Sequence, residues 1–392
     1  MSRRLKISCF TLEGLNSFAT VLYFNYLYFF MRKTFGFDDK HNLLLAGFLG
    51  FVYVFAAWQA GKFAQRAGYF TALKVGFGIM AVSLAAGLCL HTAIGQIIAA
   101  ACVTIGMCFI WPTLEALVSD SETAARLPNI VGLYNVVWAV TNAASYFIGG
   151  TLIEMYGYKI IYVLPLVVVL CQLSITFWMQ RHATVLAREA LNKPKTELPP
   201  EPHRPASPKA QAFLKMAWMA NPFAYIAIQT LIAVIPGIAD KFHLTPMMAG
   251  FACTLWCFVR LGFFVVLWHW TDWHYRFRWL VTAFVVLILS FATILMAPNL
   301  AVLIIAQIFF GGAIGLIYYS SLFYSMDAGG DSRGEHGGVH EAAIGLGNCL
   351  GPAIGAAALQ WAPGNPNSSA IAVSALLLCG LGGLIGIWKT AK

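Results

Sequence analysis

Charged side chains are scarce in this sequence: only 10% of its 392 residues are Asp, Glu, Lys or Arg, whereas 59% are hydrophobic. A typical soluble domain is about 25% charged, and so few charges cannot cover the surface of a soluble protein of this length. The shortage argues against a cytosolic enzyme, a nucleic-acid-binding protein, a disordered chain and a secreted disulfide scaffold. The net charge of +9 then indicates basic loops beside a membrane rather than a nucleic-acid partner.

Motifs for disulfides, metals and nucleotides are also missing. The nine cysteines lie almost entirely within apolar runs, and no CxxC pair occurs. Gly345-x-Gly347 lies in an apolar helix with no preceding strand, and His340-Glu341 is not followed by the second histidine of HExxH. We therefore expect no disulfide framework, no metal site, no cofactor and no enzymatic activity.

Long apolar runs, by contrast, are abundant. About 20 residues suffice for a helix to cross the hydrocarbon core, and open strands cannot satisfy their backbone hydrogen bonds there. We predict an all-α membrane protein with twelve transmembrane helices, at residues 8–31, 43–61, 71–91, 94–117, 128–153, 159–180, 213–237, 246–269, 279–297, 300–324, 339–361 and 368–388. The first run is longer than the apolar core of a signal peptide, so we interpret it as a retained helix.

The basic residues fall mostly in alternate loops. Lys62, Arg66 and Lys74 lie in one such loop, and seven more basic residues lie between positions 181 and 215. Only Arg32, Lys33, Lys40, Lys159 and Lys241 lie on the opposite side. Since basic loops stay in the cytoplasm, we predict a multi-pass protein of the cytoplasmic (plasma or inner) membrane with both termini in the cytoplasm.

The longest polar stretch divides the chain in the middle. It contains KPKTELPPEPHRPASPK, a composition that is typical of a flexible linker. Six predicted helices precede it and six follow. We therefore expect an N-terminal six-helix bundle at residues 1–180, a cytoplasmic linker at 181–212 and a C-terminal six-helix bundle at 213–392.

The two halves also show a weak repeat. Ala46-Gly47-Phe48 matches Ala249-Gly250-Phe251 at an offset of 203 residues, and Thr141-Asn142 aligns with Gly347-Asn348 at an offset of 206. Each match is weak by itself, and the evidence for a repeat is their common order and similar offset. Parallel repeats of six helices around a midplane site are one known plan of transporters.

The loop between the second and third predicted helices carries a further signature. It reads Gly61-Lys-Phe-Ala-Gln65-Arg66-Ala-Gly68, close to GxxxDRxGRR. With the twelve-helix plan, it resembles the major facilitator superfamily over nearly the whole chain. The resemblance implies a gating loop formed by Gly61, Gln65, Arg66 and Gly68, with Asp272 at the matching position of the second half. Because Gln65 replaces the family's acid, a charged latch is less favoured here.

Ionisable side chains within spanning helices are costly and usually face a cavity or a partner. Arg260 lies about ten residues, or roughly 15 Å, from the cytoplasmic end of its helix. We predict that it binds an anionic substrate group or pairs with a proton-binding acid. Glu13, Glu115, Glu341 and His340 lie nearer the cytoplasmic face and are candidates for proton coupling; salt bridges between helices are the competing interpretation.

Polar and aromatic side chains follow helical faces in the predicted spans. Glu13, Asn16, Thr20 and Tyr23 share one face, and Asn135, Trp138 and Asn142 share another. The predicted substrate-binding residues are Arg260, Asn16, Tyr23, Asn25, Tyr26, Asn135, Trp138, Asn142, Gln229, Tyr318 and Tyr319. Hydrogen bonding between helices is the alternative for these residues.

These observations predict a secondary active transporter that works by alternating access. Its expected partners are a small organic solute, with an anionic group as one option, protons and the lipid bilayer, and we expect a monomer that binds no nucleic acid. Two alternatives stay open. A gradient-independent facilitator of the same fold takes up solute unaffected by an uncoupler, and a receptor on the same scaffold binds solute without flux.

Overall fold

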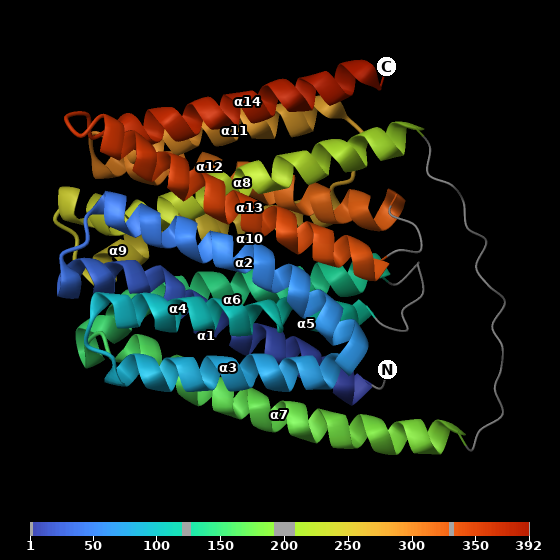
Figure 1. Ribbon diagram of the computed structural model, residues 1–392. Coiled ribbons are helices and arrows are strands. Elements are labelled where there is room, and N and C mark those ends of the chain that lie inside the picture. The colour runs from blue at the N-terminus through green and yellow to red at the C-terminus, as the bar shows by residue number, and fades with distance from the viewer. Residues whose placement is uncertain (1–2, 120–126, 192–207, 329–332, 392) are drawn as a thin grey trace.

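The computed structural model describes residues 3–119, 127–191, 208–328 and 333–391, and the regular elements in these ranges are α-helices (Figure 1). The first half contains α1 (Arg3–Phe35), α2 (Asp39–Ala67), α3 (Tyr69–Cys89), α4 (Ala93–Cys108), α5 (Trp111–Ser119), α6 (Leu127–Tyr156) and α7 (Ile160–Leu191). The second half contains α8 (Pro208–Lys241), α9 (Pro246–Ala252), α10 (Leu255–His269), α11 (Phe277–Leu295), α12 (Leu300–Ala328), α13 (Arg333–Trp361) and α14 (Ser368–Thr390).

Twelve spans arise because α4 and α5 form one broken span and α9 and α10 form another. Within the described ranges, eleven spans are long and apolar enough to cross a membrane. The twelfth, α1, is 33 residues long but more polar. Its polar side chains, including Glu13, Asn16 and Thr20, are buried inside the protein rather than facing lipid. The prediction of an all-α, twelve-helix membrane protein is confirmed.

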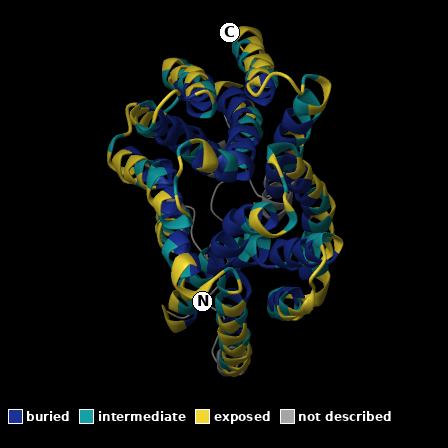
Figure 2. Ribbon diagram, turned by 90° about the vertical axis from the view of Figure 1, so that its left-hand side faces the viewer, coloured by how far each residue is buried: buried dark blue, intermediate teal, exposed yellow. Residues whose placement is uncertain are grey.

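The outer surface of the two bundles is apolar. Large hydrophobic side chains such as Val82, Ile94 and Leu289 are more than 60% exposed, and Figure 2 shows exposed residues on the outward faces with buried residues between the helices. In lipid this pattern is stable, since a hydrocarbon-facing surface has no need of charge. The scarcity of charge in the sequence therefore follows directly from the fold.

Two spans that the sequence predicts as continuous are broken. The α4–α5 span breaks at Phe109 and Ile110, because Pro112 has no N–H to donate to the carbonyl of Cys108 and its ring crowds that turn. The α9–α10 span breaks at Cys253 and Thr254. There the Thr254 hydroxyl donates to the carbonyl of Gly250 at 2.5 Å, a side-chain bond that competes with the helical ladder.

Helices α7 and α8 extend into both ends of the predicted linker. α7 continues to Leu191 and α8 begins at Pro208, so the helices are longer than the apolar runs that predicted them. The rest of the range 181–212 lies outside the described residues. The division into bundles at residues 180 and 213 stays a prediction.

Two long interfaces join the bundles. At the α2–α13 interface, the backbone of Ala353 lies against Gly47, and an added Cβ at Gly47 would lie 3.3 Å from the nitrogen of Ala353. At the α6–α9/α10 interface, a Cβ at Gly250 would lie 3.0 Å from the carbonyl oxygen of Phe147. Gly47 matches Gly250 at offset 203, and Phe147 matches Ala353 at offset 206. The repeat seen in the sequence therefore relates the two interfaces.

Both ends of the chain lie at the same end of the helices, where α1 begins and α14 finishes (Figure 1). We call the opposite end the distal end. There Asp38 caps α2, accepting a hydrogen bond from the His41 amide at 2.9 Å. Burial works to raise the pKa of Asp38, but the hydrogen bonds from the His41 backbone and ring outweigh it and hold this pKa below its usual value.

Candidate functional site

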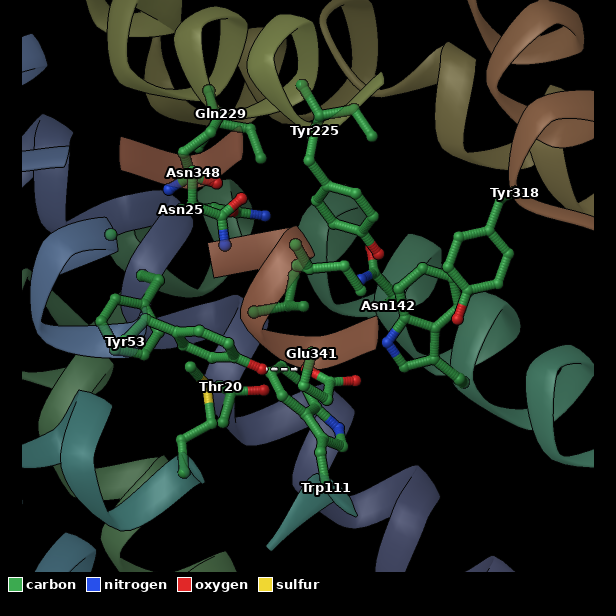
Figure 3. Close-up of a pocket in the computed structure, with 18 of the residues that line it drawn as sticks. Thr20, Asn25, Tyr53, Trp111, Asn142, Tyr225, Gln229, Tyr318, Glu341 and Asn348 are labelled. Carbon is green, nitrogen blue, oxygen red and sulfur yellow. Dashed lines mark hydrogen bonds between the residues drawn. The ribbon is translucent and has the colours of Figure 1, made fainter. Parts of the chain in front are cut away.

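A cavity with about 1150 Å³ of empty space, its mouth included, lies between the two bundles. Its walls come from nine helices: α1, α2, α4, α5 and α6 of the first half and α8, α10, α12 and α13 of the second. Figure 3 shows side chains from both halves pointing into it, with Tyr53, Trp111 and Glu341 on one side and Tyr318 and Asn142 on another.

Ten of the predicted site residues line this cavity. They are Glu13, Asn25, Glu115, Asn135, Trp138, Asn142, Gln229, Arg260, Tyr318 and Glu341. Residues up to 328 positions apart in the chain are thus brought together. The side chain of the remaining proton-coupling candidate, His340, lies outside the described residues.

Four other candidates lie outside the cavity lining. Asn16 and Tyr23 are buried within the first bundle, where the Tyr23 ring packs edge-on against Tyr162. The Tyr26 hydroxyl donates to the carbonyl of Tyr146 at 2.6 Å. Tyr319 packs against Phe264 and Trp273.

Several cavity residues were not among the predicted ones, and seven of them are aromatic. Trp111, Tyr134, Tyr225 and Trp256 all line the cavity. Each stands four residues before a predicted polar residue, namely Glu115, Trp138, Gln229 and Arg260, and so lies on the same helical face. This spacing would have predicted that the four aromatic residues also line the cavity. Tyr53 carried no such signal, because its partner belongs to the other half of the chain.

The buried carboxyl group of Glu13 has a hydroxyl partner at each of its oxygens. The Tyr134 hydroxyl donates to its Oε2 at 2.5 Å, and the Ser17 hydroxyl donates to its Oε1 at 2.7 Å. Hydrogen bonds to an ionised group are stronger than neutral ones, so these two donors hold the side chain in one position.

Glu341 links the two bundles. It is buried on α13, and the Tyr53 hydroxyl on α2 donates a short hydrogen bond to its Oε2 (Figure 3). The two residues are 288 positions apart. The Tyr53–Glu341 hydrogen bond is therefore a direct contact between the two halves.

Arg260 is held by aromatic rings rather than by an acid. Its guanidinium carbon lies 4.4 Å from the ring centre of Trp138 on α6 and 5.0 Å from that of Trp256 on its own helix. The side chain is 3% exposed, and its Nε and Nη2 have no hydrogen-bond partner in the described part of the chain. A buried guanidinium with unused N–H groups is well suited to bind a carboxylate or another planar anion.

The residues of the predicted gating loop lie at the terminal end of the helices. Gly68 joins α2 to α3 with φ of 87°, a conformation that favours glycine. Gln65 and Arg66 are exposed, and Gly61 has open space around it. Asp272 is also exposed, and one of its oxygens lies 3.9 Å from the Arg276 guanidinium.

Polar contacts join the two bundles at the distal end. The Arg32 guanidinium pairs with Asp39 of its own bundle at 2.9 Å and with Asp240 on α8 at 2.6 Å. At the α6–α9/α10 interface, the Met247 amide donates to Glu154 at 2.9 Å. At the α2–α13 interface, the Lys40 ammonium donates to Gln360 at 3.1 Å.

A twelve-span fold with a cavity between two repeat-related bundles limits the protein families to which the chain can belong. Comparison with known families identifies the family. The sequence model of the Major Facilitator Superfamily matches residues 9–221, more than half of the chain. The chain belongs to the Major Facilitator Superfamily. A comparison with curated proteins found no match.

Two solved transporter structures match this chain over nearly its full length. The structure of the human organic anion transporter MFSD10 (TETRAN) has a TM-score of 0.67 at 14% identity, covering 97% of this chain and 99% of that one. A mutant of the peptide transporter POT has a TM-score of 0.70 at 12% identity, covering 98% and 94%. At these identities the likeness establishes the fold. Membership of this superfamily indicates a membrane protein that transports a solute.

Proposed function

We propose that this protein is a proton-coupled secondary transporter that moves a small organic solute with an anionic group by alternating access. Arg260 carries the proposal: it is a buried cation that faces the cavity with unused N–H groups. Leaving a buried charge unpaired costs several kcal/mol, and an anionic solute removes that cost when it binds.

Proton coupling is supported by the carboxyl groups of the cavity. Glu13, Glu115 and Glu341 all line it, and carboxyl groups in such surroundings can exchange protons near neutral pH. Glu341 is the best placed of them, since its partner Tyr53 belongs to the other bundle. Protonation there is coupled to the contact that must change when the bundles rock.

Alternating access is supported by the polar contacts at the distal end. The Arg32, Glu154 and Lys40 contacts join the bundles there, and we propose that they break when the bundles rock. With the basic loops in the cytoplasm, the distal end is the outer one. We propose a monomer in the cytoplasmic membrane with both termini inside.

The test is a thermal-shift screen of the purified full-length protein against a solute library, followed by flux into proteoliposomes. We expect anions to dominate the hits, Arg260→Gln to abolish them, and accumulation to require a pH gradient. Flux that an uncoupler leaves unchanged would identify a facilitator. Binding without flux would identify a receptor. Hits that Arg260→Gln leaves unaffected would overturn the proposed site.

A further inference from the structure

Two opposite charges face the cavity without a counter-ion. Arg260 forms no ion pair within 4 Å in the described ranges, and two of its nitrogens lack any hydrogen-bond partner. Glu115 also lines the cavity, and it accepts no hydrogen bond from the residues that the structure describes. Glu13 and Glu341 differ from Glu115, because tyrosine hydroxyls already donate to both.

Aromatic side chains of the cavity lie near both of these residues. The Trp138 ring, which holds Arg260, stacks on Tyr318 with ring centres 5.4 Å apart and planes inclined by 15°. Tyr318 and its neighbour Tyr225 lie within electrostatic range of Arg260 and of Glu115 alike. The cavity therefore offers a cation at Arg260, a carboxyl group at Glu115 and the flat aromatic surfaces of Trp138 and Tyr318.

This arrangement discriminates among ligand charges. A simple anion at Arg260 enters a cavity that also holds three carboxyl groups, and a simple cation at Glu115 enters one that holds a buried guanidinium. A solute with both an anionic and a cationic group satisfies Arg260 and Glu115 together. Its apolar part can then stack on Trp138 and Tyr318.

We propose that the substrate is a zwitterion with an apolar or aromatic body, whose carboxylate binds Arg260 and whose ammonium group binds Glu115. This inference rests on the proposed function, since it uses the same cavity and the same anion site. It adds the second charge and the residue that recognises it.

The test measures affinity of the full-length protein in detergent by isothermal titration, with two matched sets of probes. The first set is phenylalanine, phenylpropanoate and phenylethylamine. The second places the charges farther apart: para-aminomethyl-phenylacetate, para-methyl-phenylacetate and para-methylbenzylamine. In at least one set, we expect the zwitterion to bind about tenfold more tightly than its matched anion and its matched amine.

Variants of Glu115 and Arg260 test which residue binds each charged group of the ligand. Glu115→Gln is expected to abolish the preference for the zwitterion, because it removes the partner of the ammonium group and one of the carboxyl groups that oppose a simple anion. Zwitterion affinity should fall and anion affinity should rise. Glu115→Asp should retain part of the preference. Arg260→Gln should weaken binding of zwitterion and anion alike. Melting temperatures of the ligand-free variants report folding, and Glu115→Gln should melt no lower than wild type, because it removes an unpaired charge.

The outcomes separate the two proposals. If the anions bind as tightly as the zwitterions, or if the preference survives Glu115→Gln, the zwitterion inference is wrong while the anion site at Arg260 stands. If binding is indifferent to Arg260→Gln, the proposed function itself fails. If none of the six probes binds, the inference is overturned for compact aromatic zwitterions.

Discussion

The α2–α13 and α6–α9/α10 interfaces are related by the sequence repeat, yet they hold opposite charges. At the first, the Tyr53 hydroxyl holds the carboxylate of Glu341; at the second, the Trp138 ring face holds Arg260. A hydroxyl can donate to a carboxylate or accept from a carboxylic acid, so it serves both protonation states. A ring face holds a cation without using its N–H groups. Under the proposed function, one interface responds to protons and the other to the solute.

The largest effect is expected from glycines at which the two interfaces come closest. A Cβ at Gly150 would lie 2.0 Å from the Pro246 carbonyl oxygen, and a Cβ at Gly50 would lie 2.4 Å from the Cys349 nitrogen. Backbone atoms cannot rotate away, so we expect Gly150→Ala and Gly50→Ala each to cost about 1–3 kcal/mol. Differential scanning fluorimetry of the purified variants measures this.

Each of these variants has a matched control on its own helix. Gly132 on α6 and Gly61 on α2 have no atom within 4 Å of an added Cβ. Alanine there should be neutral or stabilise the helix by up to about 1 kcal/mol. If the control variants melt as low as the interface variants, close backbone contact is not the cause. If only one interface variant melts low, the two interfaces are not equivalent.

The second effect concerns Arg260. Arg260→Gln should weaken binding of phenylpropanoate by about 100-fold, since charge-assisted hydrogen bonds to a buried anion contribute about 2–3 kcal/mol. Arg260→Lys keeps the charge but loses the planar stacking on Trp138, and about a tenfold loss is expected. Equal affinity of Arg260→Gln and wild type in titration would contradict the role of Arg260 as the anion site, and equal affinity of Arg260→Lys and wild type would contradict the role of the stacking on Trp138.

The third effect separates coupling from stability at the other interface. Glu341→Gln has the shape of the protonated side chain, so melting should change by less than about 1 kcal/mol. Solute exchange across proteoliposomes should persist, while accumulation driven by a pH gradient should be lost. Tyr53→Phe serves as the comparison, because it leaves the acid in place and removes only its donor. Full accumulation by Glu341→Gln would show that protons do not act here.

The smallest effect is expected at the exposed distal bridge. Asp240→Asn removes one arm of the Arg32 bridge, whose Asp240 side chain is 64% exposed. Exposed pairs contribute roughly 0.2–1 kcal/mol and are screened by salt. At low salt, Asp240→Asn should therefore melt slightly lower than wild type. At high salt, screening should remove this contribution from wild type, and the difference in melting temperature should disappear. Asp272→Asn, which touches only its own bundle, is the control and should not show this change.

The sequence predicted the spans well, because lipid imposes a simple rule on helices such as α11 and α12. It missed the breaks at Phe109–Ile110 and Cys253–Thr254, where local chemistry around Pro112 and Thr254 overrides a continuous apolar run. The predicted spans were shorter than α7 and α8, since these helices continue into polar solvent beyond the last apolar residue.

The candidate site was predictable where one helix carries the signal. Arg260, Glu115 and Asn142 stand out as polar residues in apolar helices. Tyr23 does not line the cavity although Glu13 on the same helix does, because the ten residues between them rotate the Tyr23 side chain away from the Glu13 direction. Its ring packs edge-on against Tyr162 within the first bundle. The pairing of Tyr53 with Glu341 depends on how two distant helices dock, and no local pattern encodes it.

The contact at Gly150 has an evolutionary consequence. The atom it meets is the Pro246 carbonyl oxygen, which every residue type at position 246 would also present. A smaller side chain at the partner position therefore cannot relieve Gly150→Ala. A selection for second-site revertants of that variant should return changes that shift α9 as a whole, such as substitutions in the Cys253–Thr254 break, and none that act by trimming residue 246.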